Sequence, residues 1–224
     1  MIPAHNESAT VHDVIRDHHD VARSLGVAYE ILVMDDGSTD GTRSESERSA
    51  RELERVRILS HPSRRGIGRS LLDLYTDARG SWIFFNAADA QVPASELVKL
   101  WRRREGNALV VGRRVPRRDP LARVVLALVY SSLLRILFAI PIRDVHSVKL
   151  YRADALKLAW PSSTTSFAED EILIALHRRG LPIVEIPIDH RPRSAGRSHG
   201  AAWSIALGAI ADLIAFWVSD RRRR

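Results

Sequence analysis

Three short stretches of the chain place polar side chains directly after an apolar run. They read "PAHNE" at 3–7, "MDDGSTDGT" at 34–42 and "NAADAQ" at 86–91. In the second stretch, adjacent carboxylates can accept hydrogen bonds from a nucleobase N–H and a ribose hydroxyl, while glycines let a ligand approach the backbone. In the first, Glu7 can accept hydrogen bonds from ribose hydroxyls. The alternative for both is a turn that caps the next helix.

These stretches fall where buried strands are expected to end. Short apolar runs alternate along the chain with segments of helical spacing or polar composition, and this alternation predicts right-handed crossovers and an α/β fold with a mainly parallel sheet. Ligands of such sheets bind beyond the carboxyl ends of the strands. We therefore expect Asp35, Asp36, Asp89 and Gln91 at one rim. The expected strands are residues 1–2, 29–35, 56–61, 81–87, 107–114, 146–152 and 182–190.

Size and composition fit one domain with a basic surface. The chain has 224 residues, of which 45% are hydrophobic, enough for a sizeable core. It has no cysteine, which excludes disulfides and thiolate metal sites. A net charge of +7 suggests an anionic partner, although the excess of arginine over lysine can also reflect codon composition. Nucleic acid is disfavoured as that partner, because no recognisable binding module is present.

In their order along the chain, five motifs resemble glycosyltransferase family 2. Within that family they are most similar to the dolichol- or polyprenyl-phosphate sugar synthases. The resemblance runs from residue 3 to about residue 199, and its first two motifs are the most specific. The motifs are "PAHNE", "DDGSTDGT", "AADAQ", "DVHSVKLYR" and "RPRSAGRS".

The resemblance implies a nucleotide-sugar transferase (GT-A-like) fold and an inverting transfer of a sugar. The donor would be a GDP- or UDP-linked sugar, and the acceptor a polyprenyl (dolichyl or undecaprenyl) phosphate at the membrane surface. By this resemblance the catalytic residues are Asp89, Lys149, Arg193 and Arg197. The nucleotide-binding residues would be Pro3, Ala4, His5, Glu7, Asp35 and Asp36.

The metal motif departs from the family pattern D-A-D-x-Q. Asp89 and Gln91 match its second carboxylate and its glutamine, whereas Ala87 replaces the first carboxylate and Asn86 is one residue out of register. Mg²⁺ or Mn²⁺ prefers oxygen ligands, so Asp89, Gln91 and a substrate diphosphate are expected to hold it more weakly. The alternatives are that Asp89 merely caps a helix, and that the chain is a catalytically impaired relative that binds nucleotide or lipid for a partner protein.

A lipid phosphate is already ionised near neutral pH, so its binding requires cations rather than a general base. The resemblance implies this role for Lys149, and it implies that Arg193 and Arg197, with Ser198, close over the donor diphosphate or the acceptor phosphate. Arg113 and Arg114 are further candidates, because they end an expected strand near the same rim. Each cation could instead be a solvated surface residue. The acids of "FAEDE" at 167–171 could include a base, but they also suit the first turn of a helix, and we expect a structural role for two of the three.

Two apolar segments predict contact with a membrane. Spanning a bilayer takes about 20 apolar residues, and residues 119–140 approach this length but contain Arg123 and Arg135. Because arginine at mid-bilayer costs about 2.5–3.5 kcal/mol, helices lying in the interface are favoured. We expect a catalytic domain over 1–200, an apolar helix with a basic tail over 201–224, and peripheral or monotopic attachment to the cytoplasmic face of the cell membrane. The alternative is two buried core helices.

Overall fold

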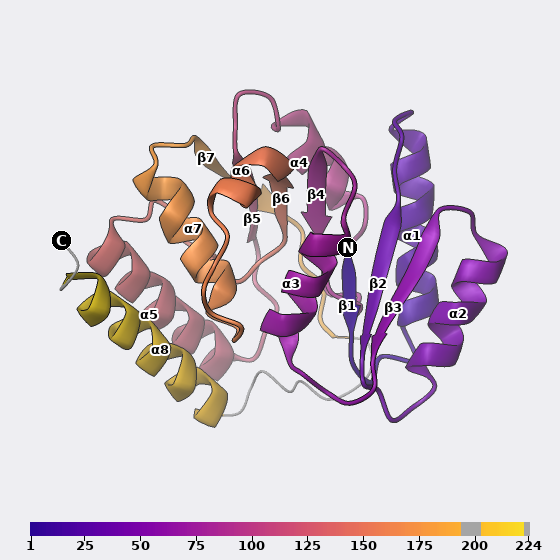
Figure 1. The fold of residues 1–224 in the computed structure, drawn as a ribbon, viewed down its shortest axis with the longest axis horizontal. Coiled ribbons are helices and arrows are strands. Elements are labelled where there is room, and N and C mark those ends of the chain that lie inside the picture. Colours follow the sequence, from indigo (N-terminus) through magenta and orange to yellow (C-terminus); the bar gives the residue numbers. More distant parts are fainter. Residues whose placement is uncertain (194–202, 222–224) are drawn as a thin grey trace.

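The computed structural model describes residues 1–193 and 203–221, whose strands form two sheets at the centre of the molecule (Figure 1). One sheet has the order β1-β2-β3 and the other the order β4-β6-β5-β7, and backbone hydrogen bonds from Asn86 N to Met1 O and from Ala88 N to Pro3 O join β1 to the segment that follows β4. Of the described strands, only β6 runs antiparallel to its neighbours. The strands are β1 (Ile2–Ala4), β2 (Ile31–Asp36), β3 (Val56–His61), β4 (Trp82–Phe85), β5 (Leu109–Arg114), β6 (Lys149–Arg152) and β7 (Ile183–Ile188).

Helices cover both faces of the sheet, because successive strand residues point to opposite sides. In β2, Ile31 and Val33 pack with α1, whereas Leu32 and Met34 pack with α3. The helices are α1 (Val11–Ser24), α2 (Thr42–Glu52), α3 (Ile67–Asp77), α4 (Glu96–Arg102), α5 (Leu121–Phe138), α6 (Ala153–Leu158), α7 (Ala168–Arg178) and α8 (Trp203–Arg221). The predicted α/β fold with a mainly parallel sheet is confirmed.

The last helix lies beside α5, and both lie near α7 (Figure 1). Phe216 of α8 packs against Phe138 and Phe167, at ring distances of 5.9 and 5.2 Å, and Leu213 is fully buried. Arg178 also makes two hydrogen bonds, of 2.6 and 2.5 Å, to Asp220. The described part of α8 is therefore attached to the body of the molecule on one side.

Candidate active site

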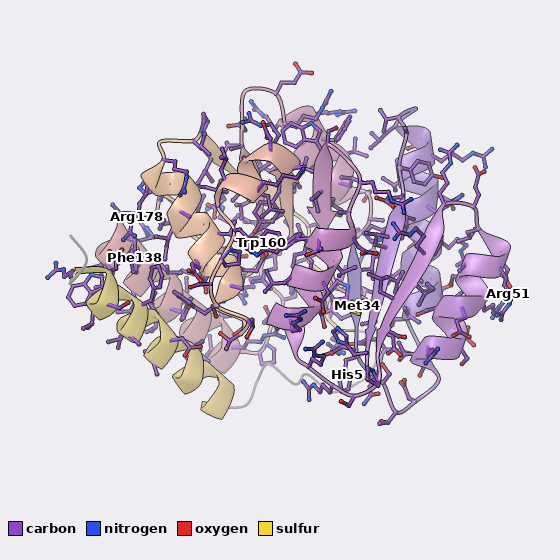
Figure 2. The ribbon with its side chains drawn as sticks, viewed as in Figure 1. His5, Met34, Arg51, Phe138, Trp160 and Arg178 are labelled. Carbon is purple, nitrogen blue, oxygen red and sulfur yellow. The ribbon has the colours of Figure 1, made fainter. Side chains whose placement is uncertain are left out.

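The carboxyl ends of β1 and β2 are tied together by hydrogen bonds. His5 Nδ1 donates to the Asp36 carbonyl at 2.9 Å, and the Glu7 amide donates to Thr42 Oγ1 at 2.8 Å. The Asn6 side-chain oxygen accepts from the Thr39 amide at 2.9 Å. Figure 2 shows His5 at this edge of the sheet. The motifs of residues 3–7 and 34–42 are therefore neighbours, as the parallel topology predicts.

The two adjacent carboxylates of this motif are both buried. Asp35 accepts from the Ser38 amide at 3.1 Å. Asp36 accepts from His61 Nδ1 at 2.7 Å and from the Arg65 and Gly66 amides at 2.8 Å each. Burial alone would raise the pKa of Asp36, but these hydrogen bonds lower it overall. Asp36 therefore anchors the loop after β3, and its contact with a nucleoside stays a prediction.

Gly37 allows that loop to approach the end of β2. Its φ is +62°, and a Cβ there would lie 2.3 Å from the Ser63 carbonyl carbon. Any other residue would have to move the loop backbone. The glycine of "DDGS" is thus required for the close packing of residues 62–66, and Arg64 of this loop reaches a neighbouring cavity.

Arg193 brings the first and third motifs together. Its guanidinium forms an ion pair with Glu7, and its Nη1 lies 3.7 Å from Asp89 Oδ2. Burial raises the pKa of Glu7, an effect that outweighs the nearby charge of Arg193. The structure therefore groups three of the predicted site residues at one rim. Arg197 and Ser198 lie outside the described residues.

The segment after β4 holds Asp89 in a turn. Asp89 Oδ1 accepts from the Gln91 amide at 3.1 Å, so Asp89 does not cap α4, which begins at Glu96. Asn86 is buried and donates to the Val92 carbonyl at 3.0 Å, so its side chain faces the core. The half-buried Ala87 supplies no ligand atom in its side chain.

This donor set suits a cation held mainly by its substrate. Over residues 1–193 and 203–221, no three His, Asp or Glu side chains lie close enough together to hold a metal ion. Asp89 retains a partly exposed carboxylate at the rim, and hard cations readily complete their shells with water and phosphate oxygens. Asp89 therefore fits a magnesium or manganese ion bound with a diphosphate.

A larger cavity of about 440 Å³ opens at the same rim, between α3, α5, α7 and the start of β6. Its walls combine cations with apolar side chains, an arrangement suited to an amphipathic anion. The polar lining residues are Arg64, Arg114, Arg117, Arg123, Tyr130, His146, Lys149, Ser166 and Glu169. The apolar ones are Ile67, Leu71, Phe85, Leu126, Ala127 and Ala209.

Lys149 lies in the wall of this cavity as part of a buried ion pair. Its Nζ is 2.5 Å from Glu169 Oε2, and both side chains are almost entirely inaccessible to solvent. Tyr75 and Tyr151 donate to the other oxygen of Glu169. Burial raises the pKa of both tyrosines, so their hydroxyls stay protonated donors. Glu169 is thus fully engaged by the protein.

Three arginines of the cavity are held by two aspartates. Arg114 makes two hydrogen bonds to Asp144, at 2.8 and 2.7 Å, and Arg117 donates to Asp119 at 2.7 Å. Arg123 Nη1 lies 3.1 Å from Asp119. Of the predicted acceptor residues, Lys149 and Arg114 line the cavity.

The structure places one predicted residue outside the cavity and adds three arginines that were not predicted to lie there. Arg113 does not line the cavity, and its Nε is 3.8 Å from Glu185. Arg64 and Arg117 were not predicted as site residues, because neither belongs to one of the five motifs. The available signal in the sequence was that each begins a pair of arginines shortly after an expected strand. Arg123 was noted only as an interruption of an apolar segment.

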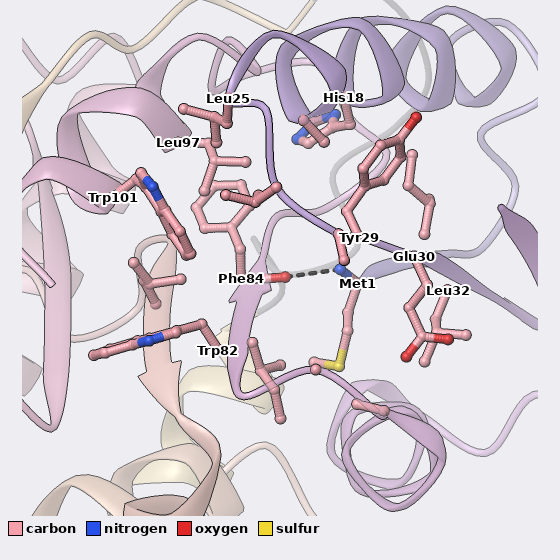
Figure 3. Close-up of a pocket in the computed structure, with 18 of the residues that line it drawn as sticks. Met1, His18, Leu25, Tyr29, Glu30, Leu32, Trp82, Phe84, Leu97 and Trp101 are labelled. Carbon is pink, nitrogen blue, oxygen red and sulfur yellow. Dashed lines mark hydrogen bonds between the residues drawn. The ribbon is translucent and has the colours of Figure 1, made fainter.

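A smaller cavity of about 150 Å³ lies at the opposite end of the sheet (Figure 3). It is lined by Tyr29, Trp82 and Phe84, among others, and the Met1 amino group donates to the Phe84 carbonyl at 2.7 Å. Because it lies at the amino ends of β1, β2 and β4, it is remote from the motifs. It contributes nothing to the candidate site.

Solved structures share this fold. Glucosyl-3-phosphoglycerate synthase from Mycobacterium tuberculosis, in complex with Mn²⁺, UDP-glucose and phosphoglyceric acid, matches with a TM-score of 0.75 and 23% identity. The match covers 96% of this chain and 78% of that one. The fold is therefore that of a nucleotide-sugar transferase.

The chain belongs to glycosyl transferase family 2, which it matches over residues 1–157. Glycosyltransferase AglD of Haloferax volcanii is 27% identical over 204 residues, 86% of this chain and 33% of that protein. Undecaprenyl-phosphate 4-deoxy-4-formamido-L-arabinose transferase of Pseudomonas paraeruginosa is 33% identical over 114 residues, 50% of this chain and 33% of that protein. The chain spans about a third of the length of both relatives, and the resemblance found in the motifs is confirmed at the level of the family.

Proposed function

We propose that the protein is an inverting glycosyltransferase that moves a sugar from a GDP- or UDP-linked donor to a polyprenyl phosphate at the cytoplasmic face of a membrane. The observation that carries the proposal is the cavity beside the carboxylate rim, which joins Lys149 and several arginines to apolar walls on α3 and α5. A phosphate would bind the cations, and the first isoprene units would lie against Leu126 and Ala127. The relative named as an undecaprenyl-phosphate transferase supports this class of acceptor.

The donor would bind where β1 and β2 end. His5 and Glu7 lie there beside the turn that follows Asp35 and Asp36. Asp89 and the donor diphosphate would hold Mg²⁺ or Mn²⁺, which supplies positive charge to the departing nucleoside diphosphate. Arg193, 3.7 Å from Asp89, would add its own charge to the leaving group.

The transfer itself requires only one displacement. An oxygen of the lipid phosphate attacks the anomeric carbon from the face opposite the diphosphate, the bond from that carbon to the diphosphate breaks, and the configuration inverts. The protein would hold the two anions in place and offset their charge. Cations that are already in position do this without rearranging during the reaction.

A direct test is to incubate the protein with radiolabelled UDP- and GDP-sugars, undecaprenyl phosphate and Mn²⁺. A labelled, lipid-extractable product would support the proposal. Nucleotide-sugar binding without any lipid product, from every common donor, would instead favour the impaired relative that Ala87 suggests.

The helix α5 offers an apolar surface for membrane attachment. It is long and apolar enough to cross a bilayer, with a mean hydropathy of 1.9, and 22% of it is buried. Its exposed apolar side chains include Leu121, Val125, Leu128 and Ile136. Since α8 packs beside it, we propose that the two helices lie in the interface with this surface toward the lipid.

Replacing Val125 and Leu128 together by glutamate is expected to weaken binding to phosphatidylglycerol vesicles by about tenfold, because two apolar contacts become charged. Vesicle flotation measures the bound fraction. Leu158→Glu, at an equally exposed position on α6, is the matched control and should float like the unaltered protein. Equal flotation of all three proteins, or release of the unaltered protein by high salt alone, would contradict this attachment.

A further inference from the structure

Arg64 differs from the other lysine and arginine side chains that line the large cavity. Each of the others forms an ion pair with a carboxylate, as Lys149 does with Glu169 and Arg114 with Asp144. Arg64 is exposed, and no carboxylate of residues 1–193 and 203–221 forms an ion pair with it. The part of the protein that the structure describes therefore leaves its positive charge without a counterion.

The backbone that carries Arg64 is held in place on two sides. Residues 62–66 join β3 to α3 (Figure 1), and two amides of this loop donate to the buried Asp36 carboxylate at 2.8 Å each. At the end of β3, His61 Nε2 lies 2.9 Å from Asp73 Oδ2 of α3. The loop is thus fixed to the strand that carries the donor motif and to a helix that lines the cavity.

An apolar path starts near Arg64 in the same cavity. Ile67 and Leu71 of α3 both line the cavity, and because they are four residues apart they lie on one face of the helix. A ligand whose anionic group met Arg64 could lay an apolar chain along this face. Inorganic phosphate or a nucleotide would leave these side chains uncovered. The cavity therefore fits an anion that has an apolar tail.

We propose that Arg64 binds the phosphate of the acceptor and so makes the cavity selective for a phosphorylated lipid. The proposal rests on the lipid-phosphate acceptor proposed above, and it assigns the contact to a residue outside the five motifs. A guanidinium stays charged and can donate two parallel hydrogen bonds to phosphate oxygens. The paired arginines of the cavity attract a phosphate less strongly, because the carboxylate beside each of them repels it.

Transfer kinetics test the contact at saturating donor. Arg64→Gln is expected to raise the KM for undecaprenyl phosphate about 10- to 100-fold, the effect of losing a hydrogen bond between charged groups. The KM for the donor and kcat should stay unchanged, because the lost contact is made equally before and during transfer. Arg64→Lys keeps the charge without the two-pronged geometry, so its KM should fall between the two.

The neighbouring residue provides the matched control. Arg65 is also exposed but does not line the cavity, and its contact with Asp36 is made by its backbone amide, which survives in Arg65→Gln. This variant loses the same charge from the same loop and should keep the acceptor KM of the unaltered protein. Thermal unfolding checks that each variant is folded, and Arg64→Lys carries the test should Arg64→Gln fail to fold.

A binding measurement without turnover separates this inference from the proposed function. Calorimetric titration with geranyl phosphate should show binding to the unaltered protein and to Arg65→Gln, and weaker binding to Arg64→Gln by the same factor as the change in KM. Inorganic phosphate, which lacks the tail, should bind more weakly than geranyl phosphate.

Equal affinities and equal acceptor KM values for the two glutamine variants would overturn the assignment of Arg64 while the proposed function stands. Binding that depends on Arg64, in a protein that makes no lipid product from any donor, would support the phosphate contact and count against the proposed function. If the unaltered protein neither binds geranyl phosphate nor makes a lipid product, both proposals fail.

Discussion

Lys149→Met is expected to lower the free energy of unfolding by about 3–5 kcal/mol, the usual cost of removing one partner of a buried ion pair. The change leaves the Glu169 carboxylate without its cation, 2.5 Å away in the intact protein, in a site that excludes water. The Tyr75 and Tyr151 hydroxyls remain but cannot compensate a full negative charge. Denaturant unfolding followed by circular dichroism measures the difference.

A double variant separates the stability of this ion pair from its role in binding. Lys149→Met with Glu169→Gln removes both charges and keeps donors and acceptors for the two tyrosines, so most of the lost stability should return. If Lys149 also serves the acceptor, the double variant should still show a KM for polyprenyl phosphate raised about tenfold or more, the effect of losing one charged hydrogen bond. Equal costs for the single and double variants would contradict the coupling.

Asp89→Asn is expected to reduce kcat about 100- to 1,000-fold, the range found when a group that stabilises developing charge is removed. The amide preserves the hydrogen bond from the Gln91 amide at 3.1 Å, so the turn should survive while the negative charge is lost. Transfer assays over a range of Mn²⁺ concentrations, with thermal unfolding as the control for folding, measure this effect. Unchanged turnover and unchanged metal dependence would remove Asp89 from the site.

The reverse change tests the missing ligand. Ala87→Asp would restore the first carboxylate of the family motif, and since affinity rises with the number of charged ligands, it should lower the Mn²⁺ concentration for half-maximal activity by about tenfold. Ala50→Asp, which adds the same charge on α2, should change nothing. An Ala87→Asp protein with the metal dependence of the unaltered one would contradict a metal site at residues 87–91 that lacks only its first carboxylate.

The sequence predicted the parts of this protein that depend on local pattern. Apolar runs ending in carboxylates predicted β2 and the end of β4, because a buried parallel strand is apolar throughout and its ligand groups follow it. The same reasoning predicted that the motifs containing Glu7 and Asp89 meet at one rim, and in the structure both carboxylates lie near Arg193. Spacing alone was sufficient, because parallel strands bring their carboxyl ends to one edge.

Roles that depend on which atoms are already hydrogen-bonded could not be predicted in this way. Asp36 and Lys149 both matched a motif, yet Asp36 binds the loop after β3 and Lys149 binds Glu169. Partners distant in the sequence cannot be recognised from the residues around either position. Two of the three acids at 169–171 were expected to have a structural role. Glu171 fits this expectation, because it accepts hydrogen bonds from the Ser162 and Ser163 amides.

By itself, then, the sequence determined the family, the α/β fold and the rim on which the motifs lie, since each depends on residue type and order. Only the tertiary structure decided which cations share a cavity and that His146 faces Asp170 beside them. Those contacts join α5, β6 and α7, and their geometry depends on how the helices pack on the sheet. Side-chain packing between distant segments sets the distances on which charge stabilisation depends, and no pattern along the chain encodes those distances directly.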